Sequence, residues 1–463
     1  AEDAALTKPP DALQARRLRY AHPLGQGFVG DPSILLKMPE NVAVNSIQVT
    51  HRTRFKIVFG FLARCPTRYD ILRRNGIECI PLISMTPPPT ATFTTRAVHA
   101  GRDDLRSLGV HALPIDLSTT YPFDDLPAAA DSLHELAHGA ASADEPVYAR
   151  LHNPTVARCE AAVADLEGAS DTVAFGSGMA AITAALLAAQ QRGGHVVAVR
   201  PLYGTTDHLL TSGLLGLDVT WADATRVSDA LRDDTALVLI ETPANPTLDL
   251  VDITAVVEQA GDVPVMVDST FAPPVIQRPL AHGAILSVHS ATKFLGGHGD
   301  VVAGVVSTSD DEWASQLRHV RVATGGLLHP MAAYLMHRSL PTLPQRVEHA
   351  QATATILADR LLSHTGVSAV RFPGRTHQGD LCARQMDGPG TLIAFDVGSA
   401  DAARRVLRQP ERMTPAVSLG SVDTLIQHPA SLTHGVVDEA AKADSGITPG
   451  LLRLSVGLED ADD

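Results

Sequence analysis

Short, wholly apolar runs alternate with amphipathic segments along the middle of the chain. Residues 196–199 and 237–240 are apolar at every position, which is typical of parallel strands covered on both faces. Residues 156–166 have apolar side chains at helical spacing and end at Gly168, and an Ala- and Leu-rich helix is predicted over 179–191. This alternation predicts an α/β domain with a doubly wound, mainly parallel sheet.

The pattern changes after about residue 345. A long Ala-rich helix is predicted over 346–362, and mixed elements follow through Val456. These features predict a smaller, C-terminal α+β domain. The expected limits are 148–344 for the large domain and 345–463 for the second.

The first 84 residues differ from the rest in charge. Residues 1–84 carry a net charge of +5, whereas the remaining chain carries −19. They show little periodicity, and Met85 is followed by the proline-rich stretch 86–89. A targeting peptide, a regulatory extension and an upstream translation start all fit; a secretory signal fits poorly. We expect an extension that is poorly ordered before about residue 90.

Composition narrows the class of protein. Hydrophobic residues make up 45% and charged residues 19% of the 463 positions, as in a soluble globular enzyme. The net charge of −14 argues against nucleic acid or an anionic membrane as the main partner, and no apolar run approaches the roughly 20 residues of a spanning helix. The four cysteines lie far apart, which suggests a reducing cytoplasm and no metal site.

One lysine stands between small hydroxyl residues and a glycine-rich turn. Lys293 follows the strand-like stretch 284–288. A lysine in a partly dry pocket has a lowered pKa and can form a Schiff base with a carbonyl, of which pyridoxal phosphate (PLP) is the commonest in metabolism. The PLP ring nitrogen needs an acidic partner, and Asp268 ends an apolar strand 25 residues upstream. Together they favour PLP chemistry over an ordinary surface lysine.

Other residues are suited to an anionic, flat cofactor. Ser177, Gly178 and Met179 open a predicted helix directly after the strand-like stretch 172–175, the arrangement in which helix N-termini bind phosphate. Capping alone would explain the same residues. Tyr203 should emerge at the C-terminal edge of a strand, where it could stack on a ring.

From about Met85 onward, the chain resembles the cysteine/methionine-metabolism family of PLP enzymes, the trans-sulfuration group. The matching stretches run in order: Tyr148-Ala149-Arg150, Asn153-Pro154-Thr155, Ser177-Gly178-Met179-Ala180-Ala181, Tyr203-Gly204, Glu241-Thr242-Pro243-Ala244-Asn245-Pro246, Val267-Asp268-Ser269-Thr270-Phe271, Ser290-Ala291-Thr292-Lys293, Ser418-Leu419-Gly420, His428-Pro429-Ala430, Thr433-His434 and Leu452-Arg453-Leu454-Ser455-Val456-Gly457. The resemblance implies fold type I of the PLP-dependent transferases, the aspartate-aminotransferase-like fold.

The resemblance also implies roles for single residues. Lys293 is similar to the Schiff-base lysine and proton shuttle, Asp268 to the partner of the pyridine nitrogen, and Tyr203 to the stacking tyrosine that takes part in proton transfer. Further positions resemble the phosphate cradle: Gly178, Met179, Ser290 and Thr292.

Two further groups of residues resemble parts of a shared active site. Tyr148 and Arg150 are similar to a pair that reaches the phosphate of a neighbouring subunit. Asn245, Ser418 and Arg453 resemble residues around the substrate carboxylate, with Arg453 as a bidentate clamp. The implied assembly is a homotetramer of two dimers, with residues 85–147 as an arm for subunit contacts.

Departures from the family pattern bear on the substrate. Cystathionine-handling relatives usually have Glu before the Ser-Leu-Gly motif, whereas this chain has Val417, as methionine γ-lyases do. Those lyases typically have Cys where this chain has Thr205. We expect a PLP-dependent γ-elimination on a small sulfur amino acid such as methionine, with cystathionine cleavage as a possible further activity. A γ-replacement on an activated homoserine ester is the alternative, and a non-catalytic carrier module would call for loss of Lys293, Tyr203 or Arg453.

Overall fold

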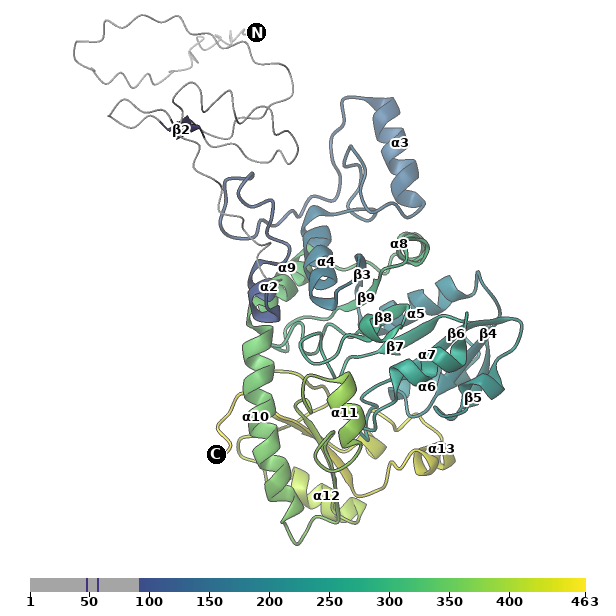
Figure 1. Ribbon diagram of the computed structural model, residues 1–463, viewed down its shortest axis with the longest axis vertical. Coiled ribbons are helices and arrows are strands. Elements are labelled where there is room, and N and C mark those ends of the chain that lie inside the picture. The colour runs from purple at the N-terminus through teal and green to yellow at the C-terminus, as the bar shows by residue number, and fades with distance from the viewer. Residues whose placement is uncertain (1–46, 49–55, 58–90) are drawn as a thin grey trace, which may run out of the picture. The chain divides into compact units, whose positions relative to one another are not determined.

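The computed structural model describes residues 91–463 together with two short strands, 47–48 and 56–57 (Figure 1). The strands β1 (Ile47–Gln48) and β2 (Lys56–Ile57) pair antiparallel. The rest of the predicted extension, 1–84, lies outside the described residues, and so does the expectation of its poor order. The chain from Pro89 to Asp463 forms one compact unit.

A seven-stranded sheet forms the larger half of this unit, in the order β3-β9-β8-β7-β6-β4-β5. Only β9 runs antiparallel to its neighbours; the pairs from β8 to β5 are parallel. The strands are β3 (Asp171–Phe175), β4 (His195–Val199), β5 (Asp218–Ala222), β6 (Thr235–Glu241), β7 (Val265–Asp268), β8 (Leu286–His289) and β9 (Gly304–Thr308). The predicted mainly parallel sheet is confirmed.

Helices cover both faces of this sheet, as a doubly wound fold requires (Figure 1). Side chains of α5, α6 and α8 pack with one face, whereas α4 and α7 pack against the other. Val197 belongs to the core with α7 and its neighbours Val196 and Ala198 to the core with α5, which explains the apolar runs. The helices are α4 (Pro154–Glu167), α5 (Gly178–Ala189), α6 (Gly204–Thr211), α7 (Ile253–Ala260), α8 (Asp311–Thr324) and α9 (Pro330–Ser339).

Local signals set the ends of α4. The Asn153 side chain accepts from the backbone N–H of Thr155 and Val156, which begins the helix. Gly168 ends it with a φ of 71°, a conformation that glycine adopts without strain. The helix predicted over 156–166 is therefore confirmed, with its glycine stop.

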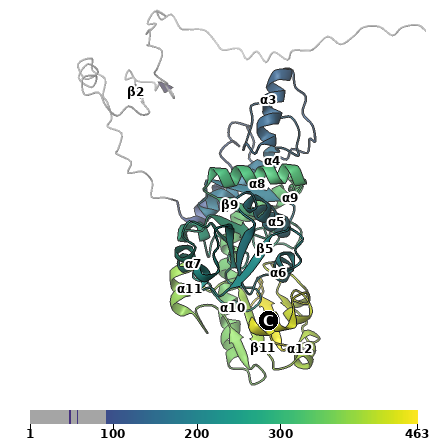
Figure 2. The same cartoon turned by 90° about the vertical axis from the view of Figure 1, so that its right-hand side faces the viewer.

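The second half contains the predicted smaller sheet, in the order β10-β11-β14-β13-β12. Its strands are β10 (Ala369–Arg371), β11 (Leu392–Asp396), β12 (Thr414–Pro415), β13 (Leu425–Gln427) and β14 (Leu451–Ser455). The long helix α10 (Leu343–Leu362) leads into it, and α11 (Gly379–Gln385) and α12 (Ala400–Leu407) follow (Figure 2). The short helix α13 (Glu439–Asp444) comes before β14 (Figure 1). The predicted domain limit at 344/345 falls within the first turn of α10.

Within residues 91–153, which the structure describes, two helices precede this core: α2 (Phe93–His99) and α3 (Leu126–Ala137). The C-terminus of α3 docks on α8, because Ser315 and Arg318 of α8 donate to the carbonyl groups of His138 and Gly139. No helix among the described residues is long and apolar enough to cross a membrane.

Candidate active site

The C-terminal ends of the parallel strands carry most of the predicted site residues. Asp268 ends β7, Lys293 lies four residues beyond β8, and Tyr203 lies four residues beyond β4. The C-terminal ends of parallel strands lie at the same edge of the sheet, and α/β enzymes bind their ligands at this edge. The remaining strand-edge group, Glu241 of β6, stands opposite Asp268 in the strand register.

Lys293 lies in a tight turn fixed from several sides. Its backbone N–H donates to Ser290, and its carbonyl accepts from Gly297. The buried Arg346 of α10 donates to the carbonyl of Phe294, 2.9 Å away, and so ties the turn to the long helix. Burial, together with the charge of Arg453, lowers the pKa of Lys293 from 10.5 to about 8. The expected lowered pKa is therefore supported by the geometry.

Asp268 is buried and held by Thr270. Its Oδ1 accepts from the backbone N–H and the hydroxyl of Thr270, at 3.0 and 2.6 Å. The same hydroxyl accepts from the N–H of Ser290, so Asp268 and the lysine turn are joined through one threonine. Burial raises the pKa of Asp268, and the Thr270 hydrogen bonds act in the opposite direction. A protonated pyridine nitrogen next to Asp268 would favour the charged form of this carboxylate further.

The N-terminus of α5 has the features of an anion site. Ser177 caps the helix through Ala180, and no hydrogen bond in the described part of the chain uses the backbone N–H of Gly178 or Met179. A Cβ on Gly178 would lie 2.7 Å from the Cβ of Ser290, so only glycine allows this approach of helix and lysine turn. Unused N–H groups at a helix start beside a serine suit a phosphate.

The hydroxyl of Thr292 has a different use in this structure. It donates to the carbonyl of Ala303 at 3.2 Å and accepts from the Ala303 N–H at 3.0 Å. Its predicted place in the phosphate cradle stays a prediction.

Arg453 is the most deeply placed cation of the site. It lies in β14, and its neighbours Leu452 and Leu454 face the core of the second domain, so Arg453 points to the opposite face. Its guanidinium donates to Asn245 Oδ1 at 2.8 Å and to the Ser418 carbonyl at 2.9 Å. With its amide oxygen turned toward Arg453, Gln427 accepts from the same group.

No ion pair among the described residues involves Arg453, although its side chain is only 2% exposed. All three of its partners are neutral. Burial lowers its pKa to about 9, so it stays charged at neutral pH. A buried charge without an anion is costly; a substrate carboxylate would supply that anion.

Ser418 joins this arginine to the lysine. The Lys293 Nζ donates to Ser418 Oγ at 3.0 Å, while the Ser418 carbonyl binds Arg453. Ser418 has a φ of 116°, which a residue other than glycine rarely adopts. Such strain occurs chiefly at functional sites, and the observation fits the predicted role of Ser418.

No role was predicted for Glu241 from the sequence, but its carboxylate joins the loops of Tyr203 and Asn245. Its two carboxylate oxygens accept from the backbone N–H of Tyr203 at 2.6 Å and of Asn245 at 3.0 Å. Burial and the nearby Asp268 raise its pKa well above the usual range. A hydrogen-bonded chain thus runs from Lys293 through Ser418, Arg453, Asn245 and Glu241 to Tyr203. The available signal was an acidic residue directly after an apolar strand, as for Asp268.

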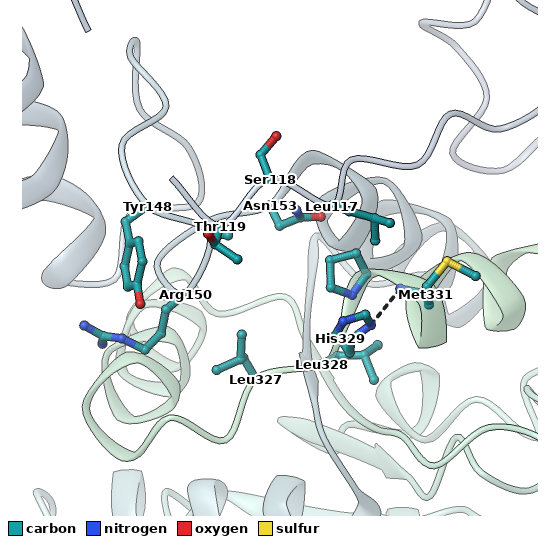
Figure 3. Close-up of a pocket in the computed structure, with 12 residues that line it drawn as sticks. Leu117, Ser118, Thr119, Tyr148, Arg150, Asn153, Leu327, Leu328, His329 and Met331 are labelled. Carbon is teal, nitrogen blue, oxygen red and sulfur yellow. Dashed lines mark hydrogen bonds between the residues drawn. The ribbon is translucent and has the colours of Figure 1, made fainter. Parts of the chain in front are cut away.

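Tyr148 and Arg150 lie elsewhere in the single chain. They line an open surface pocket of about 490 Å³ (Figure 3). Arg150 donates to the Val322 carbonyl, and its guanidinium lies 5.4 Å from the ring centre of Tyr148. Val417 also stays apart from the buried network, with 53% of its surface exposed beside Ser418.

Comparison with known proteins identifies the family of this chain. Residues 94–463 match the model of the Cys/Met metabolism PLP-dependent enzymes. An L-methionine gamma-lyase of Brevibacterium sandarakinum is 54% identical over 375 residues, covering 80% of this chain and 94% of the relative. One from Porphyromonas gingivalis is 41% identical, covering 80% and 94%.

Solved structures show the same relationship. Cystathionine gamma synthase from Xanthomonas oryzae, in complex with aminoacrylate and cysteine, has a TM-score of 0.74 and 38% identity, and covers 81% of this chain and 96% of its own. Cystathionine gamma-lyase from Lactobacillus plantarum, complexed with L-serine, has a TM-score of 0.73 and 30% identity, covering 80% and 96%. The fold is that of the type I PLP-dependent enzymes. The chain belongs to the Cys/Met metabolism family of PLP-dependent enzymes.

The site fits the cofactor of this family. The amine of Lys293, the buried carboxylate of Asp268 and the free N–H groups of Gly178 and Met179 would bind the aldehyde, the ring nitrogen and the phosphate of PLP. No group of three His, Cys, Asp or Glu residues within the described ranges could hold a metal ion.

Proposed function

We propose that this enzyme catalyses γ-elimination on L-methionine and other small sulfur amino acids. Methionine and water would give 2-oxobutanoate, ammonia and methanethiol. The observation that carries the proposal is the buried, positively charged Arg453, which has only neutral hydrogen-bond partners. Arg453 belongs to the same hydrogen-bonded network as Lys293, so a substrate carboxylate bound to it would lie near the lysine. Three relatives at 54% identity are named L-methionine gamma-lyase, which supports the choice among members of the family.

Separate residues of the site would bind the substrate and transfer its protons. Arg453 and Asn245 bind the substrate carboxylate and so orient Cα toward Lys293. PLP, when bound, supplies an electron sink for the charge left at Cα. The Lys293 amine, neutral in part near pH 7 because its pKa is about 8, takes the proton from Cα and carries protons in the later steps. The Tyr203 phenol lies on the loop fixed by Glu241 and serves as a second proton carrier.

The apolar side chain of Val417 favours a substrate whose own side chain has no charged group at its far end. It is apolar and exposed directly beside Ser418, so a thioether would lose little there, whereas a distal ammonium group would find no partner in this side chain. Cleavage of L-cystathionine is therefore expected to be the weaker activity.

A γ-replacement reaction is the second candidate, because solved relatives include cystathionine gamma synthases. The deciding experiment supplies the purified enzyme separately with L-methionine, L-homocysteine, L-cystathionine, and O-acylhomoserine plus cysteine. The products 2-oxobutanoate, thiol and cystathionine are followed, with Lys293→Ala as the inactive control. Faster synthesis of cystathionine than breakdown of methionine would overturn the lyase proposal.

The shared active site is part of the proposal. Tyr148 and Arg150 face a surface pocket rather than the Lys293 network, as expected if they serve a neighbouring subunit. The preceding arm exposes large apolar side chains such as Leu117, Phe123 and Leu126, at 58%, 49% and 67%. A homotetramer in the cytoplasm would cover these surfaces.

A further inference from the structure

A buried histidine of the second domain lies behind the loops that carry Tyr203 and Asn245. The side chain of His434 is among the most buried in the chain, at 1% exposure. Its Nε2 lies 3.3 Å from the carbonyl oxygen of Leu202 and 3.1 Å from that of Asn245. One ring nitrogen therefore contacts both loops.

The geometry fixes the form of this imidazole. Carbonyl oxygens only accept, so Nε2 carries the hydrogen and shares it between Leu202 and Asn245. The other nitrogen, Nδ1, accepts from the hydroxyl of Thr433 at 3.0 Å. Burial and the charge of Arg453 lower the pKa of His434 to about 4, so the ring is neutral under ordinary conditions.

The backbone around His434 also packs closely against the Tyr203 loop. A Cβ on Gly204 would lie 2.1 Å from the Thr433 carbonyl oxygen and 3.2 Å from the Cα of His434. Any other residue at 204 would push the start of α6 away from this segment. The close approach is independent of the histidine hydrogen bonds and joins the same two pieces of chain.

Each of the two loops is therefore held through a backbone N–H group and through a backbone carbonyl group. Glu241 accepts the N–H groups of Tyr203 and Asn245, and His434 contacts the carbonyl groups of Leu202 and Asn245. We propose that His434 is a positioning residue, which fixes the Tyr203 ring and the Asn245 amide relative to each other across the domain boundary.

The expected effect follows from what the two loops carry. Asn245 orients Arg453 through a 2.8 Å hydrogen bond, and Tyr203 is the candidate proton carrier. Displacing a catalytic group by about 1 Å can reduce turnover on the order of 100-fold. Loss of the His434 contacts should therefore impair turnover far more than it impairs folding. Only this effect on turnover rests on the proposed function.

The test compares His434→Ala and His434→Gln with a matched control in the same segment. His428 is also buried and also bonds a carbonyl, that of Pro449 at 2.8 Å, but contacts neither loop. Hydrogen–deuterium exchange of peptides covering 200–206 and 243–249 is measured on the full-length protein with and without PLP. Melting temperature, PLP stoichiometry, and kcat and KM for L-methionine are measured alongside.

We expect His434→Ala to bind PLP, to exchange at least tenfold faster in both peptides, and to lose about 10–100-fold in kcat. His434→Gln should recover most of both, because its amide nitrogen carries a hydrogen for each carbonyl. His428→Ala should lower the melting temperature to a similar degree with kcat unchanged. Unchanged exchange in His434→Ala, or equal loss of kcat in His428→Ala, would overturn the proposal. If the unmodified enzyme does not cleave methionine, the proposed function fails, while the exchange comparison still decides the role of His434.

Discussion

Loading of PLP onto the apo-protein should depend on pH with a midpoint near 8. Only the neutral amine of Lys293 can attack the PLP aldehyde. With a pKa of about 8, about 9% of this amine is neutral at pH 7, compared with about 0.03% for a lysine at 10.5. The structure thus predicts an advantage of about 300-fold at pH 7, produced mainly by burial and secondly by Arg453. The loading rate should rise steeply from pH 6 to 8 and level off above about pH 9.

The assay strips the cofactor with hydroxylamine and follows the return of visible absorbance after mixing with PLP. A lysine model peptide, measured in parallel, accounts for the ionisation of PLP itself. Arg453→Met should move the midpoint upward, because a nearby positive charge is removed, whereas Arg453→Lys should leave it nearly in place. A rate that keeps rising toward pH 10.5, or a midpoint that does not respond to Arg453→Met, would refute this account of the site.

Three further experiments test other parts of the site. Gly178→Ala puts a Cβ 2.7 Å from Ser290 and should weaken PLP binding by about 10–100-fold in an equilibrium titration, from about 1–3 kcal/mol of overpacking; an unchanged affinity would show that the close approach is unimportant. Val417→Glu should shift the ratio of kcat/KM toward L-cystathionine, about tenfold for each 1.4 kcal/mol of new contact, and a shift toward methionine would contradict the role of Val417. Mixed Arg150→Ala and Lys293→Ala subunits should regain partial activity, and no recovery after demonstrated subunit exchange would exclude a shared site.

The elements near the cofactor site could be predicted because their signals are local. The helix over 156–166 has its own cap and glycine stop, and the strand that ends at Asp268 is apolar up to that residue because both faces of the sheet are covered. The place of Tyr203 and of the lysine turn at the C-terminal edge of the sheet follows from the rule for ligand sites in α/β sheets. Family resemblance added the roles of the separate residues.

The connections between these residues could not be predicted from local pattern. Arg453 and Asn245 are 208 positions apart in the chain, and their hydrogen bond depends on how the second sheet meets the first. The positive φ of Ser418 has no signature in its residue type, since glycine is the usual choice there. Glu241 received no predicted role, because its two N–H partners lie in loops whose approach no local pattern shows.

Arg453 occupies the middle of the smaller sheet, with β11 on one side and β13 on the other. Its backbone register is fixed twice, opposite Ala394 and opposite Gln427, so the guanidinium cannot slip along the strand without breaking two ladders. Val417, by contrast, lies on an exposed segment after the short strand β12. Under the proposed function, the carboxylate common to every amino acid would be bound by a residue of a central strand, and the side-chain preference would depend on a residue of an exposed segment. Changes of substrate within this scaffold are therefore expected to accumulate around Val417 while the carboxylate site stays constant.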